Sequence, residues 1–185
     1  MPKTTEVNER AVLRLLDTIL GRAPVRSELE PIVRRVERSL LEDPGAIMAY
    51  EPVPLSLYDE TLPDSIGSSW IFILRAGVAT GAERHPNSRQ RMMSYRGAGD
   101  LQIRPGAAWQ SHHLVSDPEA PLSKRWVSIP PWTWHQAIVP GENVPRENWV
   151  VVSYHTVPDV ELIEERPDPA NPDLTRRRRY LEKTP

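Results

Sequence analysis

The sequence contains no cysteine among its 185 residues. A disulfide framework, a thiolate metal ligand and a cysteine nucleophile are therefore all excluded. The sequence also lacks an apolar run close to the ~20 residues that a membrane-spanning helix needs. Its N-terminus lacks the charged-then-apolar pattern of a secretion signal, so we expect a cytoplasmic protein with no membrane partner.

A strong charge of either sign is also missing. The net charge is −2, so no overall field favours nucleic acid as a partner. The one dense basic segment is the run of four arginines at residues 176–179. It invites a nucleic-acid or membrane interpretation, but the run is short and neighbouring acids offset it. We expect a solvated tail or one short surface helix over residues 166–185.

Apolar periodicity is helical only near the N-terminus. Residues 5–20 repeat apolar side chains at the spacing of one helix face, and Gly21 can close that helix. A second helix is predicted to start near Ser27, where the sequence S-E-L-E has the pattern of a capping box. The segment Asp43-Pro-Gly would end it. We therefore predict a helical appendage over residues 1–45.

From residue 46 to residue 165 the pattern changes to short strands. Proline is abundant, with 20 residues, and turn-forming residues separate most of the apolar segments. Regular short strands with such breaks favour a β-sandwich or barrel. The strand candidates are 70–74, 83–85, 90–96, 101–104, 108–115, 124–129, 136–139, 149–156 and 160–164.

Two stretches, residues 77–97 and 130–135, carry candidate metal ligands at fixed spacings. In the first, Gly77 is followed after five residues by Glu83-x-His85, then by Gln90 and Gly97. In the second, His135 follows a Pro-Pro corner. This spacing resembles the two signature motifs of the cupin superfamily. The resemblance implies a mostly β fold, a cupin double-stranded β-barrel (jelly roll) with both motifs pointing inward, here preceded by the N-terminal helical pair.

The candidate ligands make a recognisable donor set. Glu83 and His85 lie two apart on one strand and so face the same side. With His135 they form two imidazoles and one carboxylate, the donor set typical of Fe(II) with open positions, so we expect a divalent metal ion, Fe(II) in particular. Gln90 is either a weak neutral ligand or a hydrogen-bonding neighbour. The alternative is a metal-free site in which Glu83 pairs with Arg89.

A narrower resemblance is to the cysteine dioxygenase family. Residues 83–90 read E-R-H-P-N-S-R-Q, where that family reads close to H-x-H-T-N-S-H-C, and Ser153-Tyr-His155 matches part of its S-x-H-x-Y motif. The resemblance implies that Ser153 and His155 orient groups around the metal or carry protons during catalysis. The alternative is an exposed strand face. The motif's tyrosine is replaced by Val157, and the family's carboxylate-binding arginine has no counterpart between Met48 and Trp70.

The combined prediction is a metal-dependent oxygenase that acts on a small organic substrate other than cysteine. The rival class is a non-oxidative or non-catalytic cupin, such as an isomerase, a lyase or a sensor. A small molecule is the expected partner, and pairing of barrel edges into a homodimer is a further expectation. Tyr95, Arg91, Arg104 and one of His112 and His113 are candidates for substrate contact.

Overall fold

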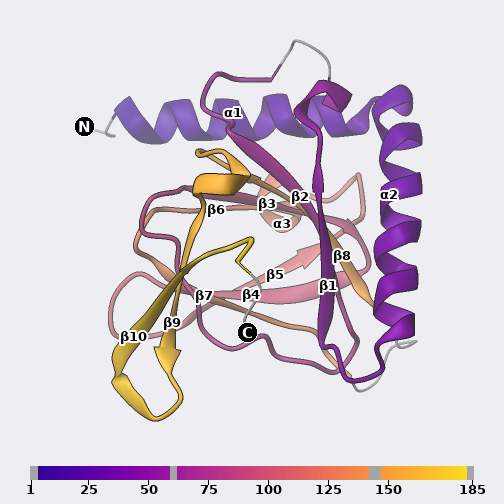
Figure 1. The fold of residues 1–185 in the computed structure, drawn as a ribbon. Coiled ribbons are helices and arrows are strands. Elements are labelled where there is room, and N and C mark those ends of the chain that lie inside the picture. The colour runs from indigo at the N-terminus through magenta and orange to yellow at the C-terminus, as the bar shows by residue number, and fades with distance from the viewer. Residues whose placement is uncertain (1–3, 59–61, 142–146, 183–185) are drawn as a thin grey trace.

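The computed structural model describes residues 4–58, 62–141 and 147–182, and Figure 1 shows its arrangement. Two long helices come first, and strands dominate the rest of the chain. Short helical turns interrupt the strands at η1 (Leu55–Tyr58), α3 (Leu122–Arg125) and η2 (Asp159–Glu161). No helix among the described residues is long and apolar enough to cross a membrane.

The helical pair consists of α1 (Thr4–Gly21) and α2 (Ala23–Glu42). The predicted first helix is close to the observed one, but the second begins at Ala23 and not near Ser27. Pro24 lies in the first turn of α2, where its fixed φ suits a helix start, and Arg22 makes no side-chain cap. The capping-box interpretation of Ser27 is therefore wrong. The buried residues of α2 form one face: Val25, Leu29, Ile32, Val33, Val36 and Leu40.

The larger sheet has five strands in the order β1-β2-β8-β3-β6. Its outer face packs under the helices in a cluster that includes Ile71, Val152 and Tyr154. Its inner face contributes Trp70 and Val151 to a second cluster. Burial on both sides explains the continuous apolar run of β2. The bounds are β1 (Met48–Val53), β2 (Ser68–Leu74), β3 (Gln90–Arg96), β6 (Trp126–Ile129) and β8 (Trp149–His155).

The smaller sheet has the order β5-β4-β7, with β4 (Ala98–Arg104), β5 (Gln110–Val115) and β7 (Trp134–Ile138). Leu101, Leu114 and Ala137 of this sheet pack against the inner face of the larger one. The segment 77–85 is not a regular strand, but it runs antiparallel to β7 through the bridges Ala79–Ile138 and Glu83–His135. The two sheets therefore enclose the region where the motifs lie.

The C-terminal hairpin comprises β9 (Ile163–Asp168) and β10 (Asn171–Arg179). It was expected to be a solvated tail or a short helix, and that expectation is wrong. Opposite charges face each other across the hairpin: Arg177 pairs with Glu165, and Arg178 with Glu164. An extended backbone brings these partners together, and a helix over the arginine run would separate them.

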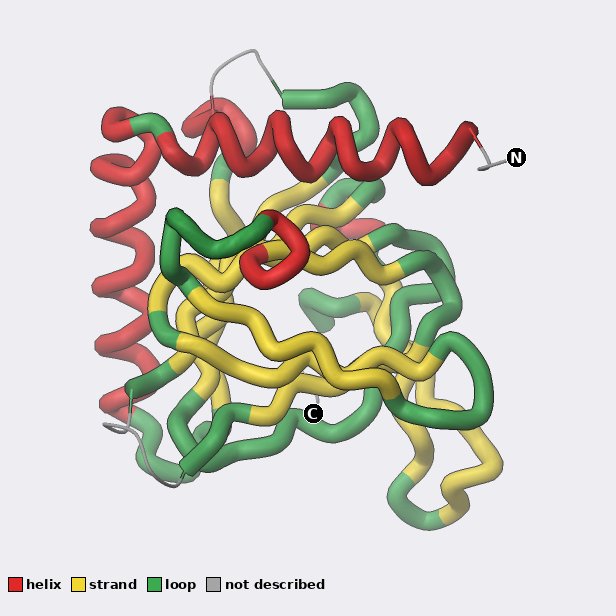
Figure 2. Tube along the Cα trace, turned by 180° about the vertical axis from the view of Figure 1, so that it is seen from behind, coloured by secondary structure: helices red, strands yellow, loops and turns green. Residues whose placement is uncertain are grey.

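The predicted fold class, mostly β and of jelly-roll type with an N-terminal helical pair, is confirmed. The sheets do not form a closed barrel over the described part of the chain. Among the described residues, the strands form a five-stranded sheet, a three-stranded sheet and a two-stranded hairpin, which no continuous hydrogen-bond ladder joins into a ring. Figure 2 shows the same arrangement from behind, with α1 running across the top of the strands and α2 down their left edge.

Candidate metal centre

Backbone hydrogen bonds place the first two candidate ligands opposite each other. Glu83 and His135 exchange a reciprocal pair of N–H···O bonds, of 2.9 and 2.8 Å, so they are directly paired across antiparallel segments. His85 follows two residues later on the same side of its segment. One candidate ligand atom from each of the three residues lies within 4.8 Å of the other two. The structure therefore brings Glu83, His85 and His135 together as a group that can hold a metal ion.

The turn before β7 supports this pairing. The amide of Trp132 donates to the carbonyl of His85 over 3.1 Å, and Thr133 donates to Pro130 over 3.3 Å. Trp132 has a φ of 64°, a region that a bulky residue rarely adopts. The side chain is exposed, and the guanidinium of Arg84 lies 5.1 Å from its ring. The Pro-Pro corner therefore fixes the two histidine-bearing segments to each other.

The two histidines are held in matching orientations. His85 Nδ1 lies 2.9 Å from the carbonyl oxygen of Ile163, and His135 Nδ1 lies 3.1 Å from that of Thr133. A carbonyl can only accept, so each Nδ1 carries the proton and each Nε2 offers a lone pair. Metal-bound histidines use this arrangement to fix the tautomer and the ring. The Nε2 atom of His135 is buried and has no hydrogen-bond partner.

The charges at the site are set by burial and by neighbouring ions. Burial alone would raise the pKa of Glu83, but the neighbouring His135, whose Nε2 lies 3.4 Å from Glu83 Oε1, and the charge of Arg166 outweigh it and hold that pKa well below its usual range. Burial, followed by the neighbouring His135, lowers the pKa of His85 to about 4. The site therefore presents a carboxylate and a neutral imidazole at neutral pH, which is the protonation state that metal binding requires.

Arg166 is the cation that neutralises Glu83 in this structure. Its guanidinium contacts the Glu83 carboxylate, and it also reaches Glu164 Oε1 at 2.9 Å and the carbonyl of Thr80 at 3.0 Å. The expected alternative partner, Arg89, instead donates to Ser128 over 3.1 Å. The metal-free alternative named the wrong arginine, because β9 brings a residue from the C-terminal hairpin next to Glu83.

Gln90 is oriented by a chain of hydrogen bonds behind it. Its Nε2 donates to Ser153 Oγ over 3.0 Å, and Ser153 Oγ lies 3.4 Å from His155 Nε2. His155 Nδ1 in turn lies 3.3 Å from Ser88 Oγ. Because the amide nitrogen is engaged by Ser153, the Gln90 oxygen is the free end, and it is buried with no hydrogen-bond partner. An unsatisfied buried oxygen of this kind fits a neutral metal ligand.

Ser153 and His155 are buried on the inner face of β8 and not on an exposed strand face. Burial, then the charges of His85 and His135, lower the pKa of His155 well below its ordinary value, so this imidazole is neutral. The His155 ring meets the His85 ring edge-on, with centroids 4.9 Å apart. Both residues therefore reach the site through Gln90 and His85, and their catalytic role stays a prediction.

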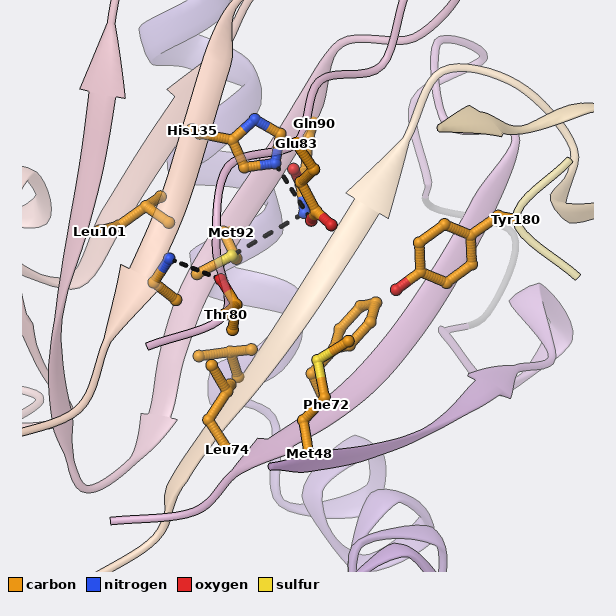
Figure 3. Close-up of a pocket in the computed structure, with 12 residues that line it drawn as sticks. Met48, Phe72, Leu74, Thr80, Glu83, Gln90, Met92, Leu101, His135 and Tyr180 are labelled. Atoms are coloured by element: carbon orange, nitrogen blue, oxygen red, sulfur yellow. Dashed lines mark hydrogen bonds and ion pairs between the residues drawn. The ribbon is translucent and has the colours of Figure 1, made fainter. Parts of the chain in front are cut away.

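A small cavity of about 30 Å³ lies beside this group. Figure 3 shows Glu83, Gln90 and His135 gathered at one end of it, with the Tyr180 hydroxyl directed inward from another side. Burial, and then the charges of Glu83 and Glu164, raise the pKa of Tyr180 well above its ordinary value, so the phenol keeps its proton. The rest of the wall is mainly apolar: Met48, Phe72, Leu74, Met92, Leu101, Ala137 and Val151.

The residues expected to contact substrate do not line this cavity. The Tyr95 hydroxyl donates to Glu30 on α2 over 3.0 Å, and Arg91 donates to Glu9 on α1 over 2.8 Å. Both lie on the outer, helix-covered face of the sheet. The guanidinium of Arg104 lies 5.0 Å from the ring of Trp109. The two adjacent histidines, His112 and His113, are also outside the cavity wall.

Two residues of the site, Arg166 and Tyr180, were not predicted from the sequence. Both lie in the segment interpreted as a solvated tail. A usable signal was present: Glu164 and Glu165 precede a turn-forming segment, D-P-A-N-P-D, and the arginine run follows it. Opposite charges on both sides of a turn are typical of paired strands. Reading these charges as a pair would have predicted the hairpin.

Comparison with known proteins gives partial structural similarity only. No family model matches the sequence, and no curated protein matches it. The similar solved structures include oxalate oxidase in complex with glycolate, at 14% identity and a TM-score of 0.44 over 61% of this chain and 52% of that one. KdgF from Halomonas sp. is similar at 12% identity and a TM-score of 0.44, covering 63% and 87% of the two chains.

CapF from Staphylococcus aureus, a capsular polysaccharide assembling protein, is similar at 16% identity and a TM-score of 0.44. The match covers 70% of this chain and 31% of CapF. The chain thus spans less than a third of CapF and about half of oxalate oxidase. The site is therefore interpreted from the side chains of this protein alone.

Proposed function

We propose that this protein is a metal-dependent oxygenase of cupin type, with Fe(II) as its metal and a small organic molecule other than cysteine as its substrate. The observation that carries the proposal is the convergence of Glu83, His85 and His135 within 4.8 Å, with a buried Nε2 on His135 that makes no hydrogen bond and lies 3.4 Å from Glu83 Oε1. Two imidazoles and one carboxylate suit Fe(II), and they leave coordination positions for oxygen and substrate.

Each side chain of the site has a distinct proposed role. Glu83, His85 and His135 would hold the ion, and the Gln90 oxygen is a fourth donor at the same end of the cavity. A bound divalent ion would supply Lewis acidity and, as iron, redox chemistry. Ser153 fixes the Gln90 amide through the 3.0 Å hydrogen bond, and His155 completes the chain behind it as a neutral imidazole. The apolar cavity wall excludes water from the reacting groups.

The charge balance supports a substrate other than an amino-acid thiol. A carboxylate in a partly dry pocket needs a cationic partner, because a buried unpaired charge costs several kcal/mol or more. The nearest guanidinium, that of Arg166, already contacts both Glu83 and Glu164. A ketone, a phenol or a similar oxygen ligand places less charge in the pocket. The apolar wall of the cavity favours the same class.

Oxygen uptake by the iron-loaded protein tests the proposal. The assay compares cysteine, 3-mercaptopropionate and cysteamine with a panel of small ketones and phenols. We expect stoichiometric uptake with a member of the panel, abolished by His135→Ala and unchanged by His113→Ala at an exposed position on β5. Rapid turnover of cysteine to its sulfinic acid would contradict the substrate class. Iron binding without uptake for any compound would instead favour an isomerase, a lyase or a sensor.

A further inference from the structure

Tyr180 follows directly after β10 and is the point where the C-terminal hairpin enters the interior. Its amide donates to the carbonyl of Leu162 over 2.8 Å, which fixes the backbone. Its ring centroid lies 5.4 Å from that of Trp70 and 6.0 Å from that of His85. Only 4% of the residue is exposed, so a side chain from near the end of the described chain is packed against a candidate metal ligand.

The hydroxyl of this residue is directed into the cavity, as Figure 3 shows. Among the residues that the structure describes, no side chain or carbonyl accepts a hydrogen bond from it. Two other buried tyrosines are satisfied inside the protein: the hydroxyl of Tyr58 lies 2.7 Å from Ser69 Oγ, and that of Tyr95 donates to Glu30. The buried hydroxyl of Tyr154 also has no hydrogen-bond partner within the described part of the chain, but Tyr154 packs under the helices and does not line the cavity. A phenol that is buried usually finds a partner, so the cavity is where its partner belongs.

The surroundings define what that partner can be. The end of the cavity that holds Glu83, Gln90 and His135 is polar, and the walls formed by Phe72 and Leu74 are apolar. A protonated phenol offers one strong donor, and its natural partner is an oxygen acceptor. A ligand that fits has a small apolar body and at least one oxygen within reach of the hydroxyl.

We propose that Tyr180 donates a hydrogen bond to an oxygen atom of the small ligand bound in this cavity, which makes the C-terminal hairpin part of the active site. The inference deepens the proposed function and rests on it for the identity of the cavity as the substrate site. It assigns to Tyr180 the selection of oxygen-bearing ligands over ligands of the same shape that lack an acceptor.

Two probes of similar size test this selection. 1-Propanol carries a neutral oxygen acceptor on a short apolar body, and 1-propanethiol carries a sulfur in its place. Their dissociation constants are measured by titration of the full-length protein loaded with cobalt(II), and again after the metal is removed. Tyr180→Phe keeps the ring and deletes only the hydroxyl. Tyr50→Phe is the matched control, because Tyr50 packs 5.3 Å from the Tyr180 ring but does not line the cavity.

We expect Tyr180→Phe to weaken 1-propanol binding by about tenfold, the effect of one hydrogen bond, and to leave propanethiol binding within about twofold. Metal content and thermal midpoint should stay unchanged, and Tyr50→Phe should change neither probe. Equal weakening of both probes, no weakening of 1-propanol, or no binding of 1-propanol by the unmutated protein would overturn the inference. Absence of bound metal would overturn the proposed function. Binding of 1-propanol that depends on Tyr180 in the metal-free protein would still support the assignment of Tyr180.

Discussion

The N-terminal helical pair and the C-terminal hairpin are both additions to the two packed sheets, and they lie at opposite corners of the molecule (Figures 1 and 2). The helices cover the outer face of the larger sheet through an apolar interface, in which Leu16 and Leu29 are fully buried. The hairpin instead reaches the inner region through charged and polar side chains, with Arg166 beside Glu83 and Tyr180 at the cavity.

The difference extends to the ion pairs that each addition makes. Asp17 of α1 accepts hydrogen bonds from Arg125 and from the indole of Trp126, and these contacts attach the helix to the outer side, away from the site. Arg166 of β9 contacts a candidate metal ligand directly. Substitutions in the helices should therefore change stability, whereas substitutions in the hairpin should change the chemistry of the site.

The largest expected effect belongs to the helical pair. Leu29→Ala in α2 removes a fully buried side chain and should lower the free energy of unfolding by about 2–5 kcal/mol. The metal content per chain should not change, because the outer face does not reach the site. Urea unfolding followed by circular dichroism measures the loss. Leu41→Ala, at a position that is 72% exposed, is the matched control. A loss of bound metal by folded Leu29→Ala protein would contradict this separation of roles.

A comparable loss of unfolding free energy is expected when the metal-free protein is acidified, because His85 is buried in its neutral form. The pKa of His85 is about 4 in the folded state against 6.5 ordinarily, so the unfolded chain takes up a proton first as the pH falls. Its contribution to stability is complete above pH 6.5 and is lost between pH 6.5 and 4, and it amounts to about 3 kcal/mol. His155 acts in the same direction.

Urea unfolding in the presence of a chelator, at a series of pH values, measures how the free energy of unfolding depends on pH. His85→Gln should flatten the dependence, whereas His113→Gln, at an exposed position, should leave it unchanged. If the free energy of unfolding depends on pH in the same way in the unmutated protein and in His85→Gln, His85 is not held neutral by burial.

An intermediate effect is expected at Arg166. Arg166→Gln removes the cation that shares the Glu83 carboxylate, so both carboxylate oxygens become available to a metal ion. We expect cobalt(II) affinity to rise about tenfold, while the metal-free protein loses stability because a buried carboxylate is left without its partner. Isothermal titration and thermal unfolding measure the two changes. Weaker cobalt binding by a folded Arg166→Gln protein would instead show that Arg166 supports the metal-bound geometry.

The smallest effect is expected at the tip of the same hairpin. Arg176 pairs with Asp168 at 2.8 Å, and the Arg176 side chain is solvent-exposed while that of Asp168 is partly exposed. Arg176→Gln should leave the cobalt affinity and the thermal midpoint within experimental error, because an exposed ion pair is screened by water and salt. It also serves as the control for Arg166→Gln. A shift in cobalt affinity equal to that of Arg166→Gln would mean that the hairpin acts through its overall charge.

The features that were predicted correctly are those that depend on patterns of neighbouring residues in the sequence. The strand at residues 90–96 was predicted with its observed bounds, and the alternation of Ser153 and His155 toward one face of β8 agrees with the 3.4 Å contact between their side chains. Glu83 and His85 were also recognised as a pair, because a spacing of two places them on one side of an extended chain. These features depend on neighbours within a few residues.

The features that were missed depend on contacts between distant segments. Arg166 meets Glu83 across 83 residues, and that contact follows from the hairpin returning along the segment 77–85. Tyr180 enters the cavity because the arginine run is extended and paired with β9, which its charge composition alone did not reveal. The helix α2 begins at Ala23 and not near Ser27, because Pro24 suits the first turn of a helix and Ser27 lies inside it.

The central claim is that Glu83, His85 and His135 hold a metal ion, and its most direct test is the metal content of protein purified without a chelating tag. The account predicts about one divalent ion per chain, lost in His85→Ala and in His135→Ala and retained in His113→Ala. Loading should also raise the thermal midpoint, because an ion that binds only the folded state stabilises it. A content well under one ion per chain, after iron, manganese, nickel and zinc have each been offered, would contradict the claim.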